Sequence, residues 1–157
     1  MGEAVMNQSV LNSPLEMVTR VALILNARPG LHRSEDAIAM LDYLTTQAAD
    51  FGLSYSNLHG DAGFELAEFA ARLKHIHAGI KMGVLARIIA AQTTPTGLRY
   101  QITDKGNEYC DALSSQYKNE YLYYLGSALA FVDSHQAVEI TDFIEQKGVL
   151  VVREDEQ

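Results

Sequence analysis

The segment from Gly79 to Leu113 constrains the fold of this chain most, because two short runs of strand character lie between two helical runs. In the second strand run, Leu98, Tyr100 and Ile102 alternate with polar residues, which is typical of a strand with one apolar face. The two runs separate at residues 94–97, where a proline cannot donate a ladder hydrogen bond and a glycine tolerates positive φ. The spacing therefore predicts a β-hairpin with strands over residues 88–94 and 98–103.

A helix that leads directly into a hairpin is typical of a winged-helix domain, a class that mostly binds nucleic acid or another protein. We therefore predict an α+β, predominantly helical fold, made of a winged-helix domain with a long C-terminal helix extension. An ordinary hairpin in some other α+β domain is the alternative, and the sequence leaves it open.

The N-terminal half carries clear helix signals. Ser13, Pro14 and Glu16 combine a capping serine, a proline at the first helical position and a glutamate that completes a capping box. They predict a helix that ends at Pro29-Gly30. Residues 34–36 open a second predicted helix, which stops before Gly52.

Residues 53–63 have the composition of a loop, and a third helix is expected to start near Phe64. Gly79 and Gly83 are candidate points at which this helix breaks into two pieces. After the hairpin, Thr103 is expected to cap one long helix that keeps apolar spacing to Val132 over about seven turns.

The length of 157 residues fits a single domain, which we divide as a flexible N-terminus (residues 1–12), a winged-helix-like domain with the long helix (13–134), and a C-terminal helix and tail packed on the same domain (135–157). The last segment contains a predicted helix over residues 135–147. It ends in a short apolar run, residues 149–152, which either completes a sheet of this fold or pairs with another edge.

The single cysteine, Cys110, cannot form a disulfide framework, so a reducing cytoplasm fits best. No membrane-spanning or signal segment is expected, because the apolar run at residues 21–25 is too short and no basic region precedes it.

The charges are unevenly distributed along the chain. Of 12 basic residues, six lie between Arg72 and Lys105, where Asp104 is the only acidic residue; the other 19 acidic residues lie elsewhere and bring the net charge to −8. Such polarity steers a basic surface toward phosphates while the acidic remainder repels them. Chance scatter of a few charges explains the pattern equally well.

Catalytic chemistry finds no support in the sequence. His75 and His77 are two residues apart on a predicted helix and therefore point in different directions. Phosphate-binding glycine loops are absent, and Cys110 lies on an apolar helical stripe. We expect no enzyme activity, no catalytic residues, no metal site and no cofactor.

Several motifs resemble the middle component of bacterial ABC-three-component systems, the small subunit of Lamassu-type defence operons. They are Leu11-Asn12-Ser13-Pro14-Leu15-Glu16-Met17 with Arg20, Leu41-Asp42-Tyr43-Leu44, Asn57-Leu58-His59 with Gly63-Phe64-Glu65-Leu66, and Gly97-Leu98-Arg99-Tyr100-Gln101-Ile102-Thr103 followed by Tyr117-Lys118. Two features depart from the family pattern: Gly60 stands where a proline is common, and Ala70-Ala71-Arg72 stands where two arginines are common.

The resemblance implies a non-catalytic winged-helix subunit of an SMC-like ABC ATPase complex that defends against phage and plasmids. Such a subunit bridges the ATPase, which senses or holds foreign DNA, and an effector, often a nuclease. The basic residues around the predicted hairpin make DNA a candidate partner of this chain as well. A winged-helix transcription regulator is the alternative function. Candidate DNA contacts are Arg72, Lys74, Lys81, Arg87 and Arg99, and candidate partner contacts are Tyr117, Tyr121, Tyr124 and Leu125.

Overall fold

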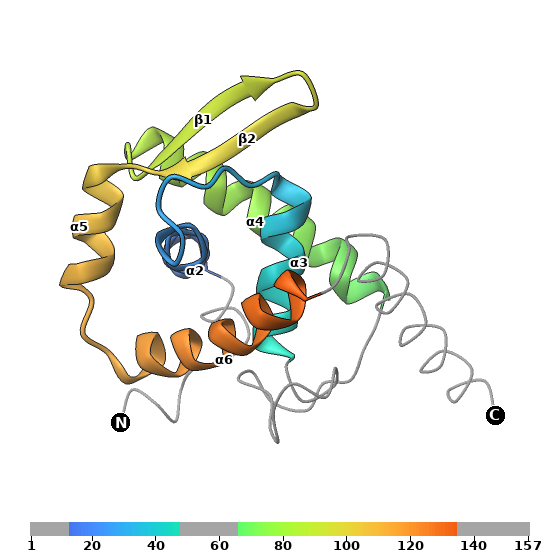
Figure 1. Cartoon of the computed structure of the whole chain (residues 1–157), viewed down its shortest axis with the longest axis vertical. Helices are drawn as coiled ribbons and strands as arrows, with labels where there is room; N and C mark the ends of the chain where they lie inside the picture. Colours follow the sequence, from blue (N-terminus) through green and yellow to red (C-terminus); the bar gives the residue numbers. More distant parts are fainter. Residues whose placement is uncertain (1–12, 48–65, 135–157) are drawn as a thin grey trace. The chain divides into compact units, whose positions relative to one another are not determined.

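The computed structural model describes residues 13–47 and 66–134, which are mostly helical with one small antiparallel sheet (Figure 1). The elements are α2 (Pro14–Asn26), α3 (Glu35–Thr46), α4 (Leu66–Leu85), β1 (Ile89–Thr94), β2 (Gly97–Ile102), α5 (Asp104–Ala112) and α6 (Gln116–Asp133). The predictions for residues 1–12, for the loop at 53–63 and for the helix and tail at 135–157 lie outside the described residues. The α+β, predominantly helical class is confirmed.

The chain divides into two compact units. The described residues of the first unit are 13–39 and 73–114, which include α2, the hairpin and α5. Those of the second unit are 40–47, 66–72 and 115–134, which include α6. No helix within these described ranges combines the length and apolar character needed to cross a bilayer.

Helix α2 is the core of the first unit. The Ser13 hydroxyl accepts a hydrogen bond from the Glu16 backbone N–H at 3.3 Å, and Pro14 occupies the first turn, so the predicted helix start is confirmed. From Met17 to Leu25 every residue except Thr19 is buried, and α2 packs against α5 and β2. A helix buried this completely is a central helix rather than a surface one.

The predicted hairpin is confirmed. Strands β1 and β2 pair in an antiparallel register from Ile89 opposite Ile102 to Thr94 opposite Gly97, which leaves Pro95 and Thr96 as the turn. Gly97 has φ of +117°, the conformation that made glycine the expected residue there. The apolar alternation holds for the buried Tyr100 and Ile102, whereas Leu98, near the turn, is exposed.

One residue of the segment before α3 forms an isolated β-bridge with β2. Arg33 pairs with Tyr100: the Arg33 N–H donates to the Tyr100 carbonyl at 2.9 Å, and the Tyr100 N–H donates to the Arg33 carbonyl at 2.8 Å. The segment between α2 and α3 is thereby joined to the hairpin.

The expected break of the third helix at a glycine is wrong, because α4 runs without interruption from Leu66 to Leu85. Gly79 and Gly83 serve close packing instead. A Cβ at Gly79 would lie 2.8 Å from the Cβ of Met17, and one at Gly83 would overlap the side chain of Ile89. Glycine suggests a helix break in the sequence, but in the structure its lack of a side chain allows Met17 and Ile89 to pack closely against α4.

The single long helix predicted after the hairpin is also wrong, because it is two helices separated at residues 113–115. Thr103 caps α5 as expected, accepting from the Gly106 N–H at 2.9 Å. Leu113 then takes an extended conformation, and Ser115 caps α6 by accepting from the Lys118 N–H at 3.1 Å. A second capping serine therefore restarts the helix, although the apolar spacing continues across the break.

Candidate interaction surface

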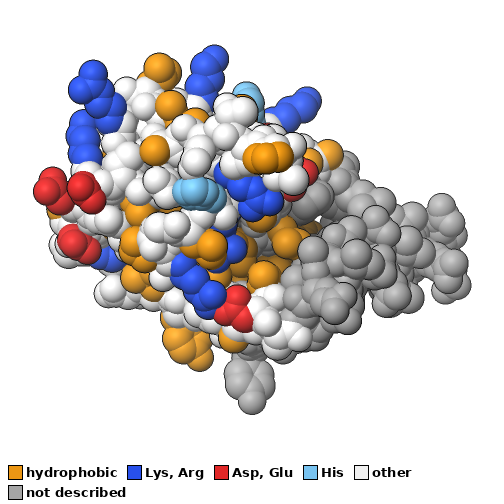
Figure 2. All heavy atoms as spheres, turned by 45° about the horizontal axis from the view of Figure 1, so that its top comes forward, with side chains coloured by type: hydrophobic (Ala, Val, Ile, Leu, Met, Phe, Trp, Pro, Cys, Tyr) orange, Lys and Arg blue, Asp and Glu red, His pale blue; other side chains and the backbone are white. Residues whose placement is uncertain are grey.

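Four of the five basic side chains predicted to contact DNA belong to the first unit. Lys74 and Lys81 are exposed on α4, Arg87 is exposed in the turn between α4 and β1, and Arg99 is half-buried on β2. Figure 2, which brings the hairpin forward, shows Lys and Arg side chains projecting from several places on this face. The fifth residue, Arg72, is placed differently.

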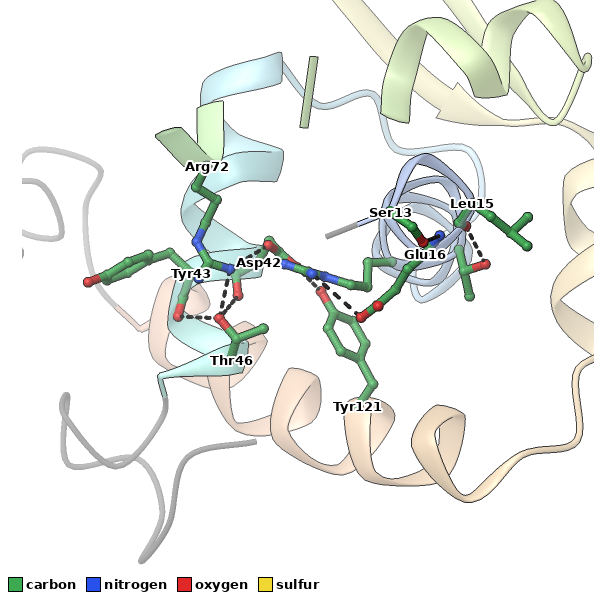
Figure 3. A network of polar contacts seen from close by, with 10 residues as sticks. Ser13, Leu15, Glu16, Asp42, Tyr43, Thr46, Arg72 and Tyr121 are labelled. Atoms are coloured by element: carbon green, nitrogen blue, oxygen red, sulfur yellow. Dashed lines mark hydrogen bonds and ion pairs between the residues drawn. The ribbon is translucent and has the colours of Figure 1, made fainter. Parts of the chain in front are cut away.

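Arg72 lies in the second unit and is only 8% exposed. Its Nη1 forms an ion pair with Asp42 Oδ2 at 2.8 Å and donates to Thr46 Oγ1 at 2.9 Å (Figure 3). Its guanidinium also lies 5.0 Å from the centre of the Tyr43 ring, within the range of a cation–π contact. Arg72 thus holds α4 to the end of α3 and does not contribute to the exposed basic surface.

Tyr121, one of the predicted partner contacts, joins the same network. It is fully buried, and its hydroxyl donates to Asp42 Oδ1 at 2.7 Å. Asp42 therefore ties α6 and α4 to α3 within the second unit. Asp42 was identified only as part of a family motif, and its position within an apolar helical run was the one sequence sign of a buried carboxylate.

The other predicted partner contacts differ in exposure. Leu125 is buried, whereas Tyr117 and Tyr124 are half-buried on α6. The neighbouring Tyr123, which was not in the predicted set, is 72% exposed and packs edge-on against Tyr124. The predicted tyrosine stripe is thus mainly the inner face of α6.

Arg87 has an unusual backbone for its residue type. Its φ is +64°, and α4 ends there in two bonds: the Arg87 N–H donates to Val84 O at 3.0 Å and the Ile88 N–H donates to Gly83 O at 2.9 Å. This is the Schellman pattern, in which the left-handed position is usually glycine. Nothing in the sequence signalled an arginine in that conformation.

The turn around Arg87 is fixed from the other side by the start of α5. The Thr103 hydroxyl donates to the Arg87 carbonyl at 2.6 Å, and the Lys105 ammonium donates to the Ala86 carbonyl at 3.0 Å. The Thr103 N–H also donates to Ile88 O at 3.1 Å. Because these bonds fix the backbone, the base of the Arg87 side chain is held in one position at the helix–hairpin junction.

Two polar side chains lie near the junction of Arg33 and β2. Burial, and after it the negative charge of Glu35, raises the pKa of Tyr100. Glu35 also contacts His77, with 2.6 Å between Glu35 Oε1 and His77 Nδ1 at an exposed position. In residues 13–47 and 66–134, no three His, Cys, Asp or Glu side chains are grouped so as to hold a metal ion.

These features define a helical protein whose distinctive surface is a basic helix–hairpin face. A family model described as ABC-three component (ABC-3C) system Middle Component 2 matches residues 10–154. The chain therefore belongs to the ABC-3C Middle Component 2 family, and the resemblance found in its motifs is confirmed. Neither the search of curated proteins nor the search of solved structures gave a significant match. As a component of a multi-subunit ABC system, the chain is expected to work with protein partners.

Proposed function

We propose that this chain is a non-catalytic accessory subunit of an SMC-like ABC ATPase complex, in which it bridges the ATPase and a nuclease-type effector. The match of the family model to residues 10–154 carries the proposal. The complex acts in the cytoplasm against phage and plasmid DNA, and a buried Cys110 that forms no disulfide is compatible with that reducing compartment.

The order of elements supports a winged-helix assignment for this subunit. Helix α2, the isolated β-bridge at Arg33, α3, α4, β1 and β2 follow one another along the chain. A winged helix has the same order, and its first strand pairs with the last strand of the hairpin. Arg33 pairs with Tyr100 of β2 in that way.

A binding role also fits the fact that the buried polar groups described here hold helices together. Arg72, Asp42 and Tyr121 bond to one another and stabilise the packing of helices. Catalytic groups, in contrast, are generally held at the edge of a cleft within reach of a substrate. We therefore propose that the subunit has no enzyme activity, metal or cofactor of its own.

DNA contact is the second part of the proposal, and it concerns Arg87 and Arg99. Both belong to the first unit, one at the helix–hairpin junction and one on β2. Because the backbone at Arg87 is already fixed, a contact between its guanidinium and a phosphate costs side-chain freedom but no further ordering of the backbone. The net charge of −8 limits the number of phosphates that the chain neutralises, so the DNA contact is weak and independent of sequence.

Co-purification tests the adaptor role. The chain is produced with a tag together with the coiled-coil ATPase and the effector encoded beside it, and the complex is isolated and resolved by size. We expect all three proteins in one peak. Isolation of the chain as a monomer while the ATPase and effector associate without it would refute the proposal.

A winged-helix transcription regulator is the competing function, favoured by the exposed basic residues around the hairpin. It predicts that the chain alone forms a dimer and binds a palindromic operator far more tightly than random DNA. Equal affinity for operator-like and random duplexes removes this alternative.

A further inference from the structure

The outer face of α4 in the first unit carries a regularly spaced seam, with Met82 and Leu85 as its large apolar side chains, that the functions above do not use. We define the α4 seam as His75, Ala78, Met82 and Leu85, all of them exposed. Met82 is 42% and Leu85 is 77% exposed, which makes Leu85 the most exposed large apolar side chain in the described residues. Isolated exposed leucines are ordinary, but these four residues are arranged regularly.

The seam has the spacing of a coiled coil. Its members are separated by three, four and three residues, which is the alternation of a and d positions in a heptad. An adjoining face of α4 is already used within the first unit, where Ile76 and Ile80 are buried and Gly79 lies against Met17. α4 is therefore apolar on two faces, and the outer one has the repeat that packs against another helix.

The border of the seam is basic. Lys74 and Lys81 are seven residues apart and directly precede His75 and Met82, so they occupy the g positions beside the a positions of the seam. Both lysines are exposed, and the salt bridges found among the described residues involve neither of them. From residue 70 to residue 85 the helix has no acidic residue.

We propose that the α4 seam docks an amphipathic helix of a partner protein, whose apolar residues follow a three-four spacing and whose flanking positions carry Glu or Asp. The proposal rests on the adaptor function above, because it names the chemistry of the partner. Carboxylates at the flanking positions pair with Lys74 and Lys81 and thereby fix the register and orientation of the partner helix.

The composition of the seam favours this occupant over two others. Base edges in DNA are contacted mainly by Arg, Lys, Asn and Gln, and none of these is among the four seam residues. The bordering Lys74 and Lys81 suit a phosphate as well as a carboxylate, and the DNA outcome of the test below separates the two. A second copy of the chain would place the same lysines against one another across an antiparallel seam, where like charges repel. An acidic helix of a different protein satisfies both the apolar repeat and the charges.

The test uses the full-length chain in two experiments. Co-expression with the ATPase and the effector shows whether each variant assembles, and titration of the purified chain against each purified partner measures its affinity. We expect Met82→Asp and Leu85→Asp each to weaken binding of one partner at least about 30-fold, as for a central anchor. Leu85→Gln, which is uncharged and compatible with a helix, weakens it about 10-fold. Lys74→Glu/Lys81→Glu also weakens binding, and it reverses the salt dependence, because the flanking pairs become repulsive and added salt then raises the remaining affinity.

Leu98→Asp is the matched control, because Leu98 is an exposed leucine of the same unit, 55% exposed, and lies on the hairpin. It should leave the affinity for the partner unchanged. Thermal unfolding of every variant establishes that the fold is intact. A photo-crosslinking residue in place of Leu85 should attach to one acidic, amphipathic segment of the partner, identified by mass spectrometry.

The outcomes separate the two proposals. If the unaltered chain does not bind the ATPase or the effector, the adaptor function fails. If it binds and the Met82 and Leu85 variants bind equally well, the adaptor function stands and the seam proposal is refuted. A loss of DNA binding alone, or a change in self-association alone, in the seam variants would also overturn it.

Discussion

At the scale of single residues, Arg87 shows how this chain departs from the usual chemistry of a helix end. Its φ of +64° lies in the left-handed region, which costs a residue with a Cβ roughly 1–2 kcal/mol. Seven hydrogen bonds in and around the turn maintain the conformation, through Val84, Gly83, Met82, Thr103 and Lys105. Glycine would serve the backbone better at this position, and the DNA contact proposed for the Arg87 side chain is one reason for an arginine there.

Replacing this arginine separates stability from function. We expect Arg87→Gly to raise the free energy of unfolding by about 0.5–1 kcal/mol, since the relief of the left-handed conformation exceeds the added entropy of glycine in the unfolded chain. Urea unfolding measures the change. Arg87→Asn, which also tolerates positive φ, should fall between the two, and a loss of stability in both variants would show that the backbone is unstrained.

The ion pair of Arg72 with Asp42 is expected to be the most sensitive polar contact of the second unit. Arg72→Met removes the cation beside a fully buried carboxylate, so the free energy of unfolding should fall by about 3–5 kcal/mol. The double variant Arg72→Met/Asp42→Asn restores a large part of the loss, because the amide oxygen still accepts from Tyr121 and no charge is buried. If the double variant is as unstable as the single one, the charge is not the cause.

Tyr100 gives the first unit a pH dependence at the alkaline end. Burial and the charge of Glu35 both disfavour the phenolate, so the pKa of Tyr100 is higher in the folded than in the unfolded chain. The resulting stability is complete below about pH 10 and is lost as the pH rises through the raised pKa. Between pH 9 and pH 11, the free energy of unfolding should therefore fall more steeply for the unaltered chain than for Tyr100→Phe, as measured by urea unfolding at each pH. Equal slopes of this free energy against pH would contradict the prediction.

At the scale of elements, the sequence predicted helix starts and the hairpin better than helix continuity. Ser13 and Thr103 were identified as caps because a capping bond joins residues only three apart. The hairpin followed from a local alternation and a local turn. Whether Gly79 interrupts α4 depends instead on Met17, which is distant in sequence, so no local pattern could decide it.

The same limit applied to the site. Three of the predicted basic contacts are exposed, namely Lys74, Lys81 and Arg87. Arg72 looks no different in sequence, but it is buried and paired with an aspartate 30 residues away. The break between α5 and α6 was missed because Leu113 and the apolar residues around it keep helical spacing. Seen with the structure, the capping Ser115 was the available signal.

Two glycines provide a test of close packing between elements. In α5, a Cβ at Gly106 would overlap the Ile88 carbonyl oxygen and the Ile102 side chain, whereas in α6 a Cβ at Gly126 would meet nothing within 4 Å. Gly106→Ala should therefore lower the free energy of unfolding by about 1–3 kcal/mol. Gly126→Ala should raise it by about 0.5–1 kcal/mol through helix propensity alone. Thermal unfolding of both variants checks the opposite signs, and a stabilising Gly106→Ala would mean that α5 is not packed against the hairpin.

At the scale of the whole molecule, the basic segment of the sequence contains more positive charges than the folded chain leaves for a partner. Six basic residues lie between Arg72 and Lys105. Arg72 forms an ion pair within the chain, and the Lys105 ammonium caps the Ala86 carbonyl. The remaining four divide between the border of the α4 seam, with Lys74 and Lys81, and the helix–hairpin junction and β2, with Arg87 and Arg99. Few basic residues are therefore left for a protein partner and for DNA. We propose that the protein partner contacts Lys74 and Lys81, and that DNA contacts Arg87 and Arg99.

This division has a measurable consequence for DNA binding by the assembled complex. Each phosphate contact contributes close to one unit to the slope of log affinity against log salt concentration. The double variant Arg87→Gln/Arg99→Gln should therefore bind random duplex DNA more weakly and reduce that slope by about two, as measured by fluorescence anisotropy between about 50 and 200 mM salt. Arg28→Gln, an exposed position outside the basic segment, should leave the slope unchanged. If removing the two hairpin arginines leaves the slope as it was while Lys74→Gln/Lys81→Gln reduces it, then DNA occupies α4, and the hairpin is the surface left for a protein.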